Sequence, residues 1–129
     1  MKLLYRFVFT VLSFNSTPVD PIDKFAELIG KGNVHELAKL FAPTIELTLM
    51  DNANTYSKAQ AEIVLTQFFA QNKPVSSKML HKVNSNSNFI FGVVIINTDK
   101  GPFRASFTLK QIDGNMQLIE LRMESEKVK

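Results

Sequence analysis

Two alternating segments near the C-terminus constrain the fold more than any other feature of the sequence. Residues 103–112 and 118–124 both alternate apolar and polar side chains, and Asp113-Gly114-Asn115 lies between them. This pattern predicts a β-hairpin with one buried face and one polar face. A three-residue connection is expected, because it places Thr108 opposite Glu120, whereas a slip by one residue would turn every side chain to the wrong face. The same register pairs apolar with apolar and polar with polar residues: Phe107 with Leu121, Leu109 with Ile119, Ala105 with Met123, Ser106 with Arg122, and Arg104 with Glu124.

Three further segments are predicted to be strands. Residues 44–50 alternate and are followed by turn-forming residues at 51–54, and residues 75–84 form a second strand that ends at a turn over 85–87. Residues 89–97 are almost continuously apolar. A strand of that kind is expected at the centre of a sheet, covered on both faces or buried in a dimer.

The remaining segments carry helix signals. Asp20 can cap the free amides of a helix that begins at Pro21, and Asn33 can cap a second, short helix that ends at Pro43. The longest helix is expected over residues 57–71, because Ser57 and Gln60 form a capping pair and the apolar residues that follow recur at helical spacing.

The first 19 residues resemble a secretory leader. Lys2 and a short apolar run precede the polar residues Asn15-Ser16-Thr17. On this interpretation residues 1–19 are removed, residues 20–129 form a single domain, and the protein is exported to the periplasm or secreted. The alternative is an ordered N-terminal strand or helix in a cytoplasmic protein, since Phe7, Phe9 and Val11 alternate.

Composition excludes several function classes. The chain has 129 residues with a net charge of +3, and its basic residues are scattered, so nucleic-acid binding is not expected. No apolar stretch is long enough for a transmembrane helix. Cysteine is absent, the two histidines lie far apart and no glycine-rich phosphate loop is present, so neither a metal site nor a cofactor is predicted.

The order of elements resembles a known architecture. Short motifs match a bacterial family, domain-of-unknown-function family 4783, within the nuclear transport factor 2-like superfamily. The matching residues are Gly32-Asn33, Ile45-Glu46-Leu47, Tyr56-Ser57-Lys58-Ala59-Gln60-Ala61, Phe68-Phe69, Leu80-His81, Gly101-Pro102-Phe103-Arg104 and Glu120-Leu121-Arg122-Met123-Glu124. The resemblance implies an α+β cone in which three N-terminal helices pack on a curved antiparallel sheet around a cavity. Because the family's activity is unknown, it implies no catalytic residue.

One cavity site follows from the alternation of residues 75–84. This alternation predicts that His81 faces the helices while Lys78 and Lys82 face outward. His81 is then either a buried neutral histidine bonded to Tyr56 or a backbone carbonyl, or a ligand contact. The predicted ligand-binding residues are His81, Tyr56, Phe68 and Phe69, for a small apolar ligand.

Catalysis is not expected, because no strand carboxylate is predicted to face inward as a general base. The sequence favours a domain that binds a small ligand or a protein partner. The alternative is an isomerase- or dehydratase-like enzyme that uses His81. The outer face of the sheet is a candidate homodimer interface with Arg104, Lys110, Glu120 and Arg122, or else a solvated polar face.

Overall fold

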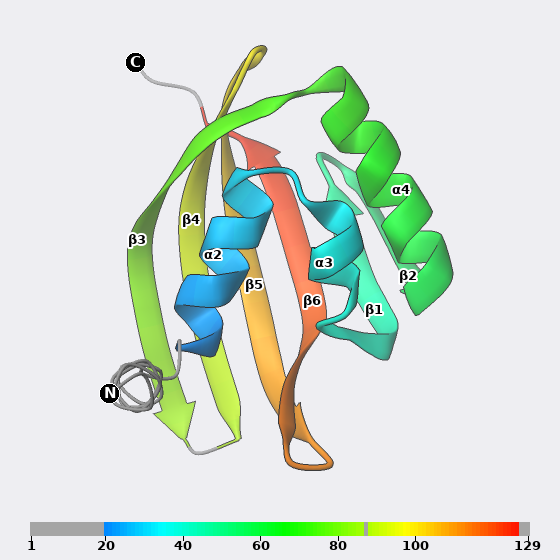
Figure 1. The fold of residues 1–129 in the computed structure, drawn as a ribbon, viewed down its shortest axis with the longest axis vertical. Helices are drawn as coiled ribbons and strands as arrows, with labels where there is room; N and C mark the ends of the chain where they lie inside the picture. The colour runs from blue at the N-terminus through cyan, green and yellow to red at the C-terminus, as the bar shows by residue number, and fades with distance from the viewer. Residues whose placement is uncertain (1–19, 87, 127–129) are drawn as a thin grey trace, which may run out of the picture.

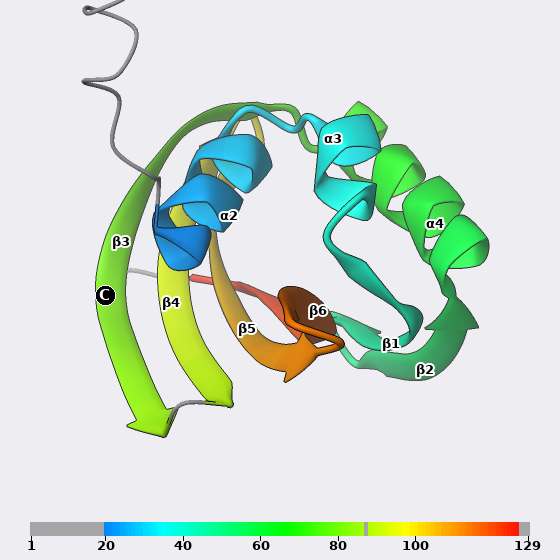
Figure 2. The same ribbon diagram turned by 60° about the horizontal axis from the view of Figure 1, so that its bottom comes forward.

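In the described part of the chain, a six-stranded curved sheet carries three helices on its concave face in the computed structural model (Figures 1 and 2). The structure describes residues 20–86 and 88–126, so the predicted leader lies outside the described residues. The elements in chain order are α2 (Pro21–Gly30), α3 (Val34–Ala38), β1 (Phe41–Leu49), β2 (Asn52–Ser57), α4 (Lys58–Gln71), β3 (Pro74–Asn86), β4 (Phe89–Thr98), β5 (Gly101–Ile112) and β6 (Asn115–Ser125). The strand order across the sheet is β2-β1-β6-β5-β4-β3. No helix in the described ranges is long and apolar enough to cross a membrane.

The predicted helix caps are confirmed. The Asp20 carboxylate accepts a hydrogen bond from the Ile22 amide at 3.0 Å, and the Ser57 hydroxyl accepts one from the Gln60 amide at 3.2 Å. These bonds satisfy amides that have no partner within their own helix. The second helix is shorter than predicted, because the chain is already extended from Phe41 and reaches Pro43 as part of β1.

The fold class is confirmed as α+β with helices on a curved sheet, but the sheet is mixed, because β1 and β6 run parallel. The edge strand β2 was not predicted. Its first three residues, 52–54, were expected to belong to a turn over residues 51–54, since they include polar residues that form strands poorly. The turn instead lies at Met50, which has a φ of +58°, and pairing with β1 makes the following segment a strand.

The predicted register of the β5–β6 hairpin is confirmed for five consecutive pairs, including Thr108 opposite Glu120. The connection is shorter than predicted. Asp113 and Gly114 have positive φ values of +51° and +84°, as in a two-residue type I′ turn. A bulge reconciles both facts, because Leu109 pairs with Leu118 and leaves Ile119 as an extra residue in β6.

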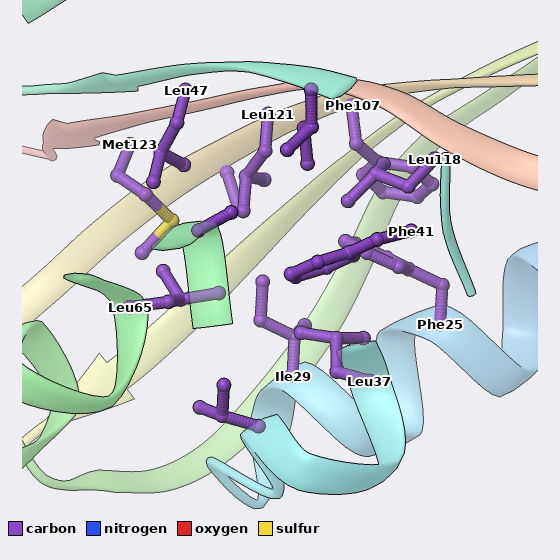
Figure 3. Close-up of a cluster of buried hydrophobic side chains, with 14 of the residues drawn as sticks. Phe25, Ile29, Leu37, Phe41, Leu47, Leu65, Phe107, Leu118, Leu121 and Met123 are labelled. Atoms are coloured by element: carbon purple, nitrogen blue, oxygen red, sulfur yellow. The ribbon is translucent and has the colours of Figure 1, made fainter. Parts of the chain in front are cut away.

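Buried side chains fill the space between the helices and the sheet (Figure 3). The rings of Phe25 in α2 and Phe107 in β5 lie 4.1 Å apart between centroids. Phe107 covers the neighbouring strand at Gly92, where an added Cβ would come within 2.4 Å of the ring. The interior that the resemblance implied to be a cavity is therefore packed in this part of the fold.

Candidate functional site

The predicted orientation of His81 is wrong. Before the middle of β3 the alternation holds, and the Ser77 hydroxyl donates to the Ala26 carbonyl at 3.2 Å on the helix side. A register shift then occurs between Met79, which pairs with Val94, and His81, which pairs with Val93. Leu80 is the extra residue of this bulge, and it inverts the two faces for the rest of the strand. His81 is therefore exposed on the outer face of the sheet.

Lys82 takes the inward position that was predicted for its neighbour. Its ammonium lies 3.2 Å from the Asp23 carboxylate and 4.0 Å from that of Asp20, at the start of α2. Lys82 lies at the rim of this face, where its side chain is 44% exposed and two carboxylates are close to its ammonium.

The other three predicted ligand-binding residues belong to the core side of the sheet. Phe69 is buried, and Phe68 and Tyr56 are half-buried against the core. Phe68 makes an edge-to-face contact with Phe103 at 5.3 Å between ring centroids. Because His81 lies on the opposite face, the four residues do not form one site, and their role as ligand contacts stays a prediction.

The four predicted interface residues lie on β5 and β6, and each has its own neighbours there. Arg104 pairs with Glu126 at 2.9 Å, a contact that holds the pKa of the Glu126 carboxyl below its usual value. The Arg122 guanidinium lies 4.0 Å from Glu124. Lys110 lies 5.7 Å from the centre of the Phe89 ring. Glu120 pairs in register with Thr108 on one side and with Glu46 on the other.

The outer face also carries an apolar strip that the residue pattern of β5 and β6 did not reveal. It consists of outward side chains from β3 and β4: Val83, Phe89, Phe91, Val93 and Ile95. Phe91 is 40% exposed and Val83 is 53% exposed, and the two residues are opposite each other across the strands. The rings of Phe89 and Phe91 are parallel to within 7°. The signal was present in the sequence, since residues 89–97 are apolar on both faces.

The position of β4 explains this exposure. The strand was predicted to be central, but it is next to the edge strand β3. Its inward residues Val94 and Ile96 are fully buried by the helices, while its outward residues remain accessible. Beside the apolar strip, the small residues Ser106 and Thr108 leave a groove of about 360 Å³. Phe91 and Val93 form one side of the groove, and Glu120, Arg122 and Glu124 form the other.

A histidine–carboxylate pair on the helix side was also missed. His35 Nδ1 lies 3.2 Å from the Glu62 carboxylate, although 27 residues separate them in the chain. The His35 side chain is 79% exposed, as expected for a surface residue near the start of a short helix, but its partner on α4 could not be inferred from helical spacing within α3. Across the described part of the chain, no group of three or more metal-ligating side chains occurs.

The geometry defines an α+β domain with a packed interior and a partly apolar outer sheet face. The chain belongs to the family described as Domain of unknown function (DUF4783), whose model matches residues 22–124. No curated protein matches the sequence.

Solved structures show the same fold. A DUF4783 family protein from Bacteroides uniformis superposes with a TM-score of 0.80 at 19% identity, covering 84% of this chain and 100% of that one. One from Bacteroides ovatus gives 0.75 at 20% identity, with 87% and 97% covered. A domain with a cystatin-like fold from Nostoc punctiforme gives 0.64 at 12% identity, with 81% and 72% covered.

Proposed function

We propose that this protein is a non-catalytic binding domain that associates with a second copy of itself through the outer face of the sheet. The observation that carries the proposal is the apolar strip on β3 and β4. A strand with apolar residues on both faces is typical of a sheet that is covered on both sides. The helices of the described residues cover one face only (Figure 2), and the apolar strip on the other face is accessible to a partner.

A second copy suits the charge pattern of this face. In a two-fold interface both copies contribute the same patch of surface. Each charged side chain of the patch therefore needs an opposite charge elsewhere in that patch. The face carries Arg122 between Glu120 and Glu124 on β6, beside the apolar strip. Opposite charges at the margin of an apolar contact can therefore pair between copies, and they would set its orientation more than its strength.

The finer assignments are part of the same proposal. We place the domain in the nuclear transport factor 2-like superfamily, because the order of its elements and its likeness to a cystatin-like fold support this.

We also propose that the protein is exported and that residues 1–19 are its leader, supported by Lys2 and the short apolar run that follows it. Mass spectrometry of the protein from its host would test this, and an intact Met1 would contradict it.

The position of His81 does not support the alternative, an isomerase- or dehydratase-like enzyme that uses this residue. It required His81 inside a cavity beside Tyr56, whereas the imidazole is exposed on the other face of the sheet. Nor does any strand carboxylate of the described chain lie among the buried core residues, where a general base of that kind would be placed.

Sedimentation equilibrium of the purified protein tests the proposal. The wild-type protein is expected to be dimeric at micromolar concentration. Phe91→Lys places a charge in the apolar strip and should give a monomer. Ile63→Lys is the matched control, because Ile63 is an exposed apolar residue, 58% accessible, of α4, a helix on the concave side of the sheet (Figure 2). A wild-type protein that stays monomeric at high micromolar concentration would overturn the proposal, as would a dimer that survives Phe91→Lys.

A further inference from the structure

A surface groove separate from the sheet face lies between α3 and α4. Its volume is about 780 Å³. It is formed by the α2–α3 connection, one face of α4 and the start of β3. The lining residues are Lys31, Gly32, Asn33, Val34, His35, Glu62, Thr66, Phe69, Ala70, Lys73 and Pro74.

The base of the groove is apolar and closely packed. Val34 and Phe69 are buried core residues that reach its surface. Gly32 has a φ of +67°, and a Cβ at this position would lie 2.9 Å from the Pro74 ring. The absence of a side chain therefore lets the α2–α3 connection lie against the start of β3, which closes the base of the groove.

The His35–Glu62 pair lies on the lining of the groove. A carboxylate accepts hydrogen bonds only, so at 3.2 Å the imidazole donates through Nδ1. In the neutral ring Nε2 then carries no hydrogen, whereas in the protonated ring Nε2 becomes a second donor. The Glu62 side chain is 35% exposed and that of His35 is 79% exposed, so the imidazole is accessible to a ligand.

The lining carries two lysines, Lys31 and Lys73, and one carboxylate, Glu62. Lys31 pairs with Glu27 at 3.1 Å, outside the groove lining. The backbone amide of Lys73 donates to Asp99 at 2.9 Å, which fixes the chain at this point. Within residues 20–86 and 88–126, no hydrogen bond or ion pair to the Lys73 ammonium is found. The groove thus offers an apolar base beside an ammonium group that has room for an anionic partner.

We propose that this groove binds a small carboxylate with an apolar body. The apolar part would lie on Val34 and Phe69, and the carboxylate would pair with Lys73 and with the protonated imidazole of His35. This inference concerns a different surface from the proposed dimer interface and does not depend on it.

Binding should strengthen on acidification, because only the protonated imidazole donates from Nε2. Glu36 on α3 follows His35 in the chain, and Lys39 lies directly after that helix. Three further charged residues share the groove lining with His35: Glu62 on α4, Lys31 in the α2–α3 connection and Lys73 ahead of β3. Glu62 already accepts from Nδ1, and Lys39 is paired with Glu36 at 3.0 Å.

Benzoate is a suitable probe, with benzamide as its uncharged counterpart. A titration followed by amide NMR chemical shifts should give saturable changes at residues 31–35 and 62–73 with benzoate and none with benzamide. Lys73→Gln should weaken binding about three- to fivefold, the range of an exposed ion pair. Lys58→Gln, on α4 but outside the lining, is the matched control and should bind like the wild type.

The two histidines of the chain allow a second test. Benzoate affinity should rise on acidification, because a protonated histidine donates from both ring nitrogens. The rise should disappear in His35→Gln and persist in His81→Gln. Shifts that are absent, spread over the surface or confined to another groove would overturn the proposal. Unchanged affinity in Lys73→Gln, or a pH dependence that survives His35→Gln, would also overturn it.

Discussion

Lys82 of β3 reaches across to Asp23 of α2, with 3.2 Å between the ammonium nitrogen and the carboxylate oxygen. The pair connects the edge of the sheet to the first turn of the helix. It exists because the bulge at Leu80 turns Lys82 inward and His81 outward. A single extra residue therefore decides which of two adjacent side chains faces the helices.

Lys82→Gln should destabilise the fold slightly. Both side chains of the pair are about half exposed, at 44% and 52%, so the loss should be at most about 1 kcal/mol in the free energy of unfolding. Urea denaturation at low and high salt measures it, and the difference from the wild type should shrink with salt. Lys78→Gln, on the outward-facing part of β3, is the control. A larger loss for Lys78→Gln than for Lys82→Gln would contradict the observed register.

Gly92→Ala should destabilise the core by about 1–3 kcal/mol, the usual cost of overpacking. The new Cβ would lie 2.4 Å from the Phe107 ring, which is itself held against Phe25. In a Phe107→Leu background, Gly92→Ala should cost less stability than it does in the wild type, because the smaller side chain leaves room for the new Cβ. Thermal unfolding of the four proteins of this cycle tests the contact. Equal effects of Gly92→Ala in both backgrounds would show that the ring is not the obstacle.

Arg122→Glu should weaken self-association if the outer face is the interface. The substitution makes Glu120, residue 122 and Glu124 all acidic, so two copies would repel each other there. Added salt should weaken the wild-type dimer and strengthen the variant's association, since screening reduces attraction in one and repulsion in the other. Lys58→Glu on α4 makes the same change in net charge and should leave the dimer constant unchanged. Equal dimer constants for Arg122→Glu and the wild type would exclude these charges from the interface.

Glu126→Gln should reduce the acid sensitivity of folding. The Arg104 guanidinium lowers the pKa of the Glu126 carboxyl from its ordinary value of 4.5, so the ionised form is favoured in the folded state. This contribution is therefore complete above the unfolded pKa and is lost as the pH falls through the lower folded pKa.

The stability difference between the wild type and Glu126→Gln should accordingly be largest near neutral pH and vanish in acid. Chemical denaturation across that range measures it. In an Arg104→Gln background the substitution at Glu126 should have little pH-dependent effect. A difference that stays constant down to strongly acidic pH would contradict the assignment to this ion pair.

The sequence predicted the candidate site less well than the fold. The outward position of Arg122 and Glu120 followed from matching two strands across a hairpin. The apolar strip was predicted only in part. The apolar run at 89–97 indicated a strand covered on both faces, but it did not indicate that one face would remain accessible. The inward placement of His81 failed, because strict alternation cannot anticipate a bulge within a strand.

Local signals were sufficient for the features that the sequence determined by itself. Asp20 and Ser57 cap the helices that follow them, and the apolar alternation selects the hairpin register, because each depends on residues near one another or on one strand pair. The tertiary structure alone decided the rest. β2 becomes a strand only by pairing with β1, and His35 meets Glu62 only because α3 packs on α4. Such contacts join residues that are distant in the chain, and their geometry depends on how whole elements pack rather than on the spacing of side chains within one element.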